Sequence, residues 1–202
     1  MPRQTPLFDT ESTLIEGLRY EEDLITPADE VTLINRLRDL PFKEFEFHGY
    51  TGKRRVVSFG WRYEYSGERL QKADDIPEFL MPLRMRAASF ARLEQTALQH
   101  VLVTEYKRDT GIGWHRDKPV FGQVIGVSLL APCLIRFRRK ISEPFKKKSN
   151  WDRVHLLARP RSVYHLSGAA RSEWQHSILR VDSLRYSITF RTLRDESFSR
   201  VP

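Results

Sequence analysis

Two side chains in one short segment of the chain could hold part of a metal ion's coordination shell. His115 and Asp117 stand two residues apart in GIGWHRDKP, and in an extended segment side chains at that spacing leave the same face. Two histidines and one carboxylate leave three positions open, which suits an iron(II) ion that must also bind a co-substrate and dioxygen. A surface strand with a local His–Asp contact would show the same spacing, so the pair alone does not identify a metal site. A third ligand has to come from elsewhere in the chain.

Three later histidines are candidates for that third ligand: His155, His165 and His176. His176 lies in SEWQHSI, nine residues before Arg185. A turn near residues 182–183 would bring the two segments side by side and place the metal ion and Arg185 in one cavity. His155 and His165 each lie in an apolar strand, where a lone histidine is more often a satisfied core residue. The spacing therefore favours His176.

The segment RYSITFR predicts a strand with one apolar face and one face that carries two arginines. Arg185, Ser187 and Arg191 lie on the second face together with Thr189. If this face meets solvent, the strand is an ordinary half-buried one. If it faces the interior, the arginines need an anionic partner, because a buried unpaired charge is costly. A dicarboxylate co-substrate would supply one, since arginine grips a carboxylate with two parallel hydrogen bonds.

The elements that must position these residues can be read from the patterning of the chain. Residues 1–24 read as an irregular arm, and a helix capped by Thr26 or Asp29 runs to about Leu40. Alternation predicts strands in FKEFEFHGY, after the basic loop GKRR, and in WRYEYSG, followed by a loop over residues 68–77. A mostly helical stretch follows to about residue 100, with a break near Pro82. Eight strand-like segments after it indicate an all-β sandwich or barrel, not βαβ units.

Composition and charge limit the class of protein. Of the 202 residues, 40% are hydrophobic and 30% charged, which is typical of a globular domain. Residues 1–50 hold 5 Lys/Arg and 11 Asp/Glu, a net −6, whereas residues 51–202 hold 29 and 15, a net +14. The basic part is where a polyanion such as nucleic acid would be attracted.

Targeting features and the cysteine count indicate a cytoplasmic protein. No stretch approaches the roughly 18 apolar residues of a membrane span, and the N-terminus lacks the apolar core of a signal peptide. The single cysteine, Cys133, lies in the apolar run VIGVSLLAPCLI, so a small core residue in a reducing compartment is expected.

Taken in order, these motifs resemble the AlkB-like iron(II)- and 2-oxoglutarate-dependent oxygenases. The resemblance comprises Tyr106, then His115-x-Asp117, then PRSVYHLSGAARSEWQHSI with His176, and finally R-x-S-x-T-F-R, and it extends over about residues 45–193. It implies a mainly β fold with flanking helices (α+β), in which a double-stranded β-helix (jelly-roll) core carries N-terminal helices and a substrate lid. One oxygenase domain over 1–202 would divide into an arm and helix (1–44), a lid (45–75), supporting helices (76–100) and the catalytic core (101–193).

The resemblance also implies roles for particular residues. The iron(II) ligands would be His115, Asp117 and His176, and these would be the catalytic residues. The distal carboxylate of 2-oxoglutarate would be held by Tyr106 and Arg185 with support from Ser187, and Arg191 would lie near the carboxylate close to the iron. Dioxygen would be the second co-substrate, and succinate, carbon dioxide and, from an N-methyl substrate, formaldehyde the products.

The resemblance also implies a substrate-binding lid, but here the residues allow alternatives and depart from the family pattern at one place. One strand face in the lid carries three aromatic residues, Trp61, Tyr63 and Tyr65, beside the basic residues 53–55. Arg54 and the three aromatics could therefore hold a base and its phosphates. The alternative is a ladder of aromatic side chains that faces the core. Trp174 could wall the iron pocket or simply pack there. Lys118-Pro119 stands where base-repairing members commonly carry an acidic residue.

Alkylated DNA or RNA is nevertheless the expected substrate, acted on by a cytoplasmic monomer that has no membrane contact. The alternatives are a protein side chain or a small molecule as substrate and, in a different class, a non-catalytic nucleic-acid-binding module. The basic run 138–148 would contact a phosphate backbone or form a solvated hairpin tip.

Overall fold

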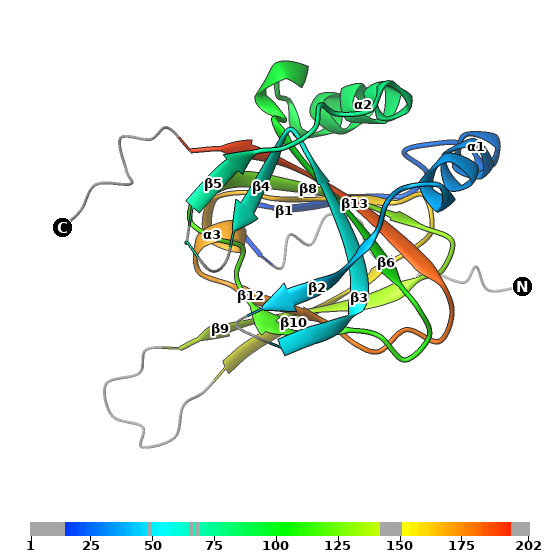
Figure 1. Ribbon diagram of the computed structural model, residues 1–202. Helices are drawn as coiled ribbons and strands as arrows, with labels where there is room; N and C mark the ends of the chain where they lie inside the picture. The colour runs from blue at the N-terminus through cyan, green and yellow to red at the C-terminus, as the bar shows by residue number, and fades with distance from the viewer. Residues whose placement is uncertain (1–14, 48–49, 65–66, 68, 142–150, 195–202) are drawn as a thin grey trace, which may run out of the picture.

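Two antiparallel sheets face each other in the computed structural model, which describes residues 15–47, 50–64, 67, 69–141 and 151–194 (Figure 1). The larger sheet has seven strands, in the spatial order β1 (Leu18–Glu21), β11 (Val163–Leu166), β8 (Phe121–Leu129), β13 (Arg185–Leu193), β6 (His100–Tyr106), β3 (Tyr50–Phe59) and β2 (Lys43–Phe47). The smaller sheet has four, in the order β10 (Trp151–Ala158), β9 (Cys133–Lys140), β12 (Gln175–Ile178) and β7 (Ile112–His115). The hairpin of β4 (Trp61–Glu64) and β5 (Arg69–Lys72) forms a separate pair.

Two apolar clusters follow from the period-two alternation of these strands. On β13, the side chains of Tyr186, Ile188 and Phe190 pack into one cluster on the outer side of the larger sheet. On β9, Ile135 and Phe137 pack into a second cluster between the two sheets. Because β13 is buried on both faces, its polar face lies in the interior between the sheets.

Helices cover the outer side of the larger sheet (Figure 1). Helix α1 (Pro27–Arg38) begins with a capping box, in which the Thr26 side chain and the Asp29 side chain each accept a hydrogen bond from the other residue's backbone N–H. Proline suits the first helical turn, so the sequence prediction of this helix is confirmed. Helix α2 (Met81–Ala91) follows the 3₁₀ turn η1 (Glu78–Leu80), and Arg92 ends α2 in a left-handed conformation. The remaining helical elements are η2 (Gln95–Ala97) and α3 (Gly168–Ser172).

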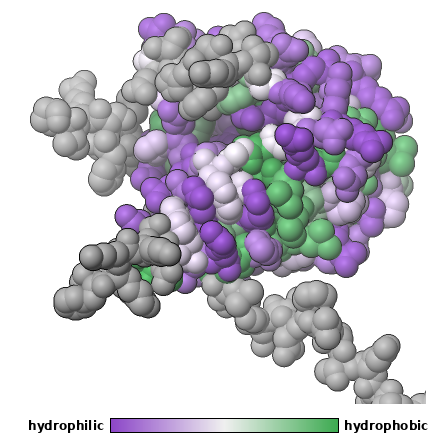
Figure 2. All heavy atoms as spheres, turned by 90° about the horizontal axis from the view of Figure 1, so that it is seen from below, coloured by the Kyte–Doolittle hydropathy of each residue, from purple (hydrophilic) through white to green (hydrophobic). Residues whose placement is uncertain are grey.

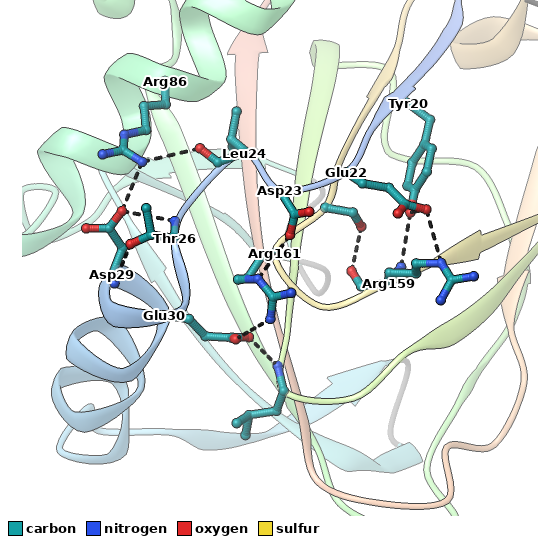
Figure 3. A network of polar contacts seen from close by, with 12 residues as sticks. Tyr20, Glu22, Asp23, Leu24, Thr26, Asp29, Glu30, Arg86, Arg159 and Arg161 are labelled. Carbon is teal, nitrogen blue, oxygen red and sulfur yellow. Dashed lines mark hydrogen bonds and ion pairs between the residues drawn. The ribbon is translucent and has the colours of Figure 1, made fainter. Parts of the chain in front are cut away.

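A polar network ties α1 to the turns at one end of the larger sheet (Figure 3). The carboxylate of Glu30 accepts a hydrogen bond of 2.8 Å from the backbone N–H of Leu130, just after β8, and lies 3.2 Å from Nη1 of Arg161, between β10 and β11. The backbone N–H of Arg161 donates to the carbonyl of Ser128 at 2.7 Å. Glu30 therefore anchors the end of β8, the strand that carries Ser128.

Several local expectations were wrong. Leu18–Glu21 is not part of an irregular arm but the edge strand β1, paired with β11. The basic residues 53–55 lie within β3 rather than in a loop, and Arg69–Lys72 is a strand. The helical stretch changes from the 3₁₀ turn to α2 next to Pro82, but α2 ends at Ala91 rather than near residue 100. For residues 18–21 and 53–55, pairing with a strand distant in the sequence overrode local composition.

The division of the chain at residues 45, 76 and 101 stays a prediction. Within the residues that the structure describes, no helix is long and apolar enough to cross a membrane.

Candidate active site

The smaller sheet brings two of the predicted metal ligands directly opposite each other. Strands β7 and β12 pair so that His115 and His176 are cross-strand neighbours, and their ring centroids are 4.2 Å apart. The Nδ1 atom of His115 lies 2.9 Å from the carbonyl oxygen of Gly113. A proton on Nδ1 is donated to this carbonyl, which orients the ring and leaves Nε2 to bind a metal ion.

Asp117 lies beside this pair, beyond the end of β7. Its Oδ2 is 3.8 Å from Nε2 of His176, while its Oδ1 accepts hydrogen bonds from Nε and Nη2 of Arg191 at 3.1 and 2.8 Å. Burial raises the pKa of the Asp117 carboxyl and is the largest single influence on it. The charge of Arg191, together with the smaller contributions of His176, His115 and Arg171, outweighs burial, and the net shift is downward. The carboxylate is therefore ionised, as a metal ligand must be.

The second histidine is held in its neutral form. Burial lowers the pKa of His176 to about 3, and neighbouring His115 acts in the same direction. A neutral imidazole is the form that binds a metal ion.

The three side chains converge without forming a finished metal site. Among the described residues, no three His, Cys, Asp or Glu side chains are grouped as a metal-binding set in their present positions. The donor types nevertheless fit iron(II): two imidazoles and one carboxylate on one side of an ion leave open positions for other ligands. The open oxygen of Asp117 and the Nε2 atoms of the two histidines are the atoms that would hold the ion.

Arg185 is the most unusual residue of the interior. Its side chain is fully buried, at 0% exposure. The Nε group donates to Oγ of Ser128 at 3.2 Å, and the guanidinium lies 5.0 Å from the ring centroid of Tyr106. Both terminal nitrogens, Nη1 and Nη2, are buried and have no hydrogen-bond partner in the described part of the chain. A carboxylate would accept from both, so this site fits the distal end of 2-oxoglutarate.

Residues around Arg185 complete an anion-binding environment that sequence patterns only partly indicated. Ser187 lies directly across from Ser128 in the β13–β8 register. Tyr164 of β11 lies near both Arg185 and Asp117, and burial raises the pKa of its hydroxyl. The Tyr164 ring occupies the space that a Cβ atom on Gly126 would fill. An isolated glycine in an apolar strand signals such a close approach; Ser128 carried no comparable signal.

Arg191 does not lie free for a co-substrate. It is 8% exposed, binds Asp117 and also lies 3.4 Å from Nδ1 of His100 through its Nη1. Its positive charge is thus next to the predicted metal ligands, and its two bonds to Asp117 orient that carboxylate.

Three of the predicted substrate residues, Arg54, Trp61 and Tyr63, take part in contacts between a cation and an aromatic ring. Arg54 packs over the ring of Phe45 at 3.6 Å, and its charge lowers the pKa of His115, although burial is the larger cause. Trp61 and Tyr63 lie on β4, beneath the ammonium groups of two lysines: Lys72 at 5.2 Å and Lys118 at 4.9 Å.

The other two substrate predictions have different outcomes. Trp174 is only 4% exposed and packs in the cluster between the sheets, with Arg139 over its ring at 5.0 Å. Tyr65 lies outside the described residues, as does most of the basic run 138–148.

Two expectations about the site require correction. His155 is not a core residue: it is exposed on β10. His176 and Arg185 do not lie on adjacent strands, since β12 belongs to the smaller sheet and β13 to the larger one. Each packs instead against the cluster between the sheets, His176 beside Phe137 and Arg185 beside Tyr106. His165 is buried as expected, with Nε2 2.7 Å from Oε1 of Gln123.

Two facing antiparallel sheets, with a His–Asp–His set on one and a buried arginine on the other, define the class of the double-stranded β-helix oxygenases. The chain matches the family model described as "2OG-Fe(II) oxygenase superfamily" over residues 17–191. It therefore belongs to this superfamily, and within it the chain is similar to AlkB-like proteins.

Two curated relatives and two solved structures illustrate the likeness. The chain is 26% identical to an "Alkylated DNA repair protein ALKBH8 homolog" of Arabidopsis thaliana, over 96% of this chain but only 60% of that protein. It is also 26% identical to protein L905 of Acanthamoeba polyphaga mimivirus, over 90% of this chain and 87% of that protein.

The structural neighbours share the fold at low identity. "The structure of OsALKBH1" superposes with a TM-score of 0.59 at 18% identity, covering 87% of this chain and 96% of that one. A 2OG-Fe(II) oxygenase family oxidoreductase from Burkholderia pseudomallei gives 0.55 at 16%, covering 88% and 85%. The predicted mainly β, double-stranded β-helix architecture is confirmed.

Proposed function

We propose that this oxygenase oxidatively demethylates N-alkylated bases in DNA or RNA. The observation that carries the oxygenase part is Arg185, whose two buried terminal nitrogens have no partner among the described residues and face the same interior as the His–Asp–His set. A dicarboxylate bound there would compensate the buried charge. Its other end would then lie toward the side chains of His115, Asp117 and His176.

The chain's own residues contribute binding and orientation. Arg185 and Tyr106 hold one end of the co-substrate, with Ser128 fixing the Nε edge of the guanidinium. Arg191 holds the Asp117 carboxylate in place through two hydrogen bonds. Bound iron(II), with 2-oxoglutarate and dioxygen, supplies the oxidising chemistry, by which an N-methyl group is hydroxylated and lost as formaldehyde.

The support for a nucleic-acid substrate comes from a relative's name, from net charge and from one contact in the β4–β5 hairpin. The first relative carries alkylated DNA repair in its name, and residues 51–202 have a net charge of +14. Tyr63 of the β4–β5 hairpin lies against Lys118, which with Pro119 stands where base-repairing members commonly carry an acidic residue. A lysine and a proline there differ from the acidic base contact of base-repairing members.

The test compares His115→Ala with His155→Ala. Succinate should form from 2-oxoglutarate only with iron(II); His115→Ala should abolish it, whereas His155→Ala, which changes an exposed histidine of β10, should retain it. Turnover that persists in His115→Ala after iron removal would exclude the oxygenase reaction. Formaldehyde release is then screened over methylated oligonucleotides; robust succinate formation with no response to any of them would point instead to a protein or small-molecule substrate.

A further inference from the structure

The outer face of the smaller sheet carries a cluster of aromatic and cationic side chains that the proposed reaction does not use. This outer patch consists of five residues: Trp114 on β7, Arg136 and Arg138 on β9, and Trp151 and Arg153 on β10. Their neighbours in the strands, His115 and Phe137, point to the opposite, inner face. The patch and the metal ligands therefore lie on the two faces of one sheet.

Two of the three guanidinium groups of the outer patch lie over tryptophan rings. Arg138 lies between two rings, 4.3 Å from the centroid of Trp114 and 4.3 Å from that of Trp151. Arg136 lies 4.9 Å from the centroid of Trp114. Cation–π contacts of this kind hold a guanidinium over a ring without using its hydrogen-bond donors.

Each of the two stacked arginines is also fixed at one edge. Nε of Arg136 donates to Oγ of Ser177 at 3.1 Å, and Nε of Arg138 donates to Oε1 of Gln175 at 2.7 Å. Both acceptors belong to β12. The positively charged groups are therefore immobilised in advance, which lowers the entropy cost of binding an anion.

The arrangement of charge on this face is unfavourable for the protein alone. Arg138 and Arg153 are direct cross-strand partners, and like charges at such positions destabilise a sheet. By strand alternation, no aspartate or glutamate occupies the described positions of this face; Asp152, which pairs with Arg139, points to the other side. Figure 2, seen from the side of β9, β10 and β12, shows hydrophilic and hydrophobic side chains next to one another there.

We propose that the outer patch binds the phosphodiester backbone of single-stranded nucleic acid. Fixed guanidinium groups that alternate with aromatic rings suit a polymer of phosphates and flat bases. Because β7 is an edge strand of the sheet, a strand held on the patch passes around β7 to reach the inner face. The choice of polymer rests on the proposed function, but binding by the patch requires neither metal ion nor co-substrate.

The test measures binding of a fluorescein-labelled 15-nucleotide oligothymidylate to the full chain by anisotropy, with a chelator present. The double variant Arg136→Gln/Arg138→Gln should weaken binding about tenfold and reduce the slope of log K against log salt by about 1.4, or 0.7 for each lost phosphate contact. The matched control, Arg36→Gln/Arg38→Gln, removes the same charge from exposed positions of α1 and should change the affinity less than twofold.

Further variants separate a fold defect and a failed reaction from a failed patch. Arg153→Gln changes an exposed side chain and should weaken binding two- to threefold without altering the thermal midpoint. His115→Ala should bind the oligonucleotide as wild type does, so a failed oxygenase assay would leave this result standing. Equal losses in the patch and control variants would overturn the proposal, as would unchanged binding in the patch variants or equally strong competition by polyglutamate of matched charge.

Discussion

Arg185 keeps a full positive charge in a position without solvent. The cost of such burial is large when donors lack partners, and two of its nitrogens lack them among the described residues. Stacking on Tyr106 and the bond to Ser128 offset only part of that cost. A bound carboxylate that accepted hydrogen bonds from both nitrogens would offset the rest.

Replacement of Arg185 by lysine should therefore weaken binding of the co-substrate more than it lowers the stability of the fold. Lysine retains the charge but cannot form two parallel bonds, and a charge-assisted bond contributes about 1.5–3 kcal/mol, so we expect KM for 2-oxoglutarate to rise about 10- to 100-fold. The measurement is initial rate against 2-oxoglutarate concentration. Arg180→Lys, at an exposed position, is the control, and an unchanged KM in Arg185→Lys would remove Arg185 from the co-substrate site.

A second residue-scale prediction concerns acid sensitivity. Burial lowers the pKa of His165 to about 4 from an ordinary value of 6.5, so the unfolded chain binds more protons between these values and stability is lost as the pH falls from 6.5 toward 4. His165→Gln should lessen this loss by on the order of 2 kcal/mol. Urea unfolding at pH 7 and pH 4.5 measures it; the same pH dependence in both proteins would contradict the prediction.

At the scale of elements, the active site depends on contacts far from the chemistry. Helix α1 reaches the end of β8 through Glu30, which binds the backbone of Leu130 and the side chain of Arg161 (Figure 3). The Arg161 backbone in turn binds the carbonyl of Ser128, whose hydroxyl fixes Arg185. One carboxylate on a helix thus supports the anion site between the sheets.

Glu30→Ala should destabilise the protein by about 1–3 kcal/mol, since it leaves a partly buried N–H and a guanidinium without their acceptor. Glu22→Ala provides the contrast, because its pair with Arg159 is about half exposed on both sides and such pairs contribute little. Chemical denaturation compares the two variants. Equal effects would mean that Glu30 is only a surface charge.

At the scale of the whole molecule, the co-substrate and metal ion would join the two sheets. The ligand set lies on and beside the smaller sheet, and Arg185 on the larger one. A complex that engages both binds only the folded state, so it stabilises that state by mass action.

Addition of manganese(II) and 2-oxoglutarate at about 100 times their dissociation constants should raise the thermal midpoint by roughly 5–10 °C. Succinate in place of 2-oxoglutarate should raise it less, because it lacks the 2-oxo group. Differential scanning fluorimetry measures the shifts. An equal rise in His115→Ala would show that the stabilisation does not come from this site.

The sequence by itself determined those features that depend only on residues close together in the chain. The capping box of α1, the two faces of β13 and the order of the ligand motifs all follow from period and spacing, which act within a few residues. The same patterns could not show that β1 pairs with β11, because a four-residue edge strand acquires its stability from its partner.

Only the tertiary structure decided which polar faces are inside. A strand with arginines on one face reads the same whether that face meets water or a second sheet, and packing of the smaller sheet against β13 made it interior. The same packing left His155 exposed although its strand reads as apolar, and it placed His176 and Arg185 on different sheets rather than on adjacent strands of one. Burial is a property of what lies opposite a residue, and that partner comes from a distant part of the chain.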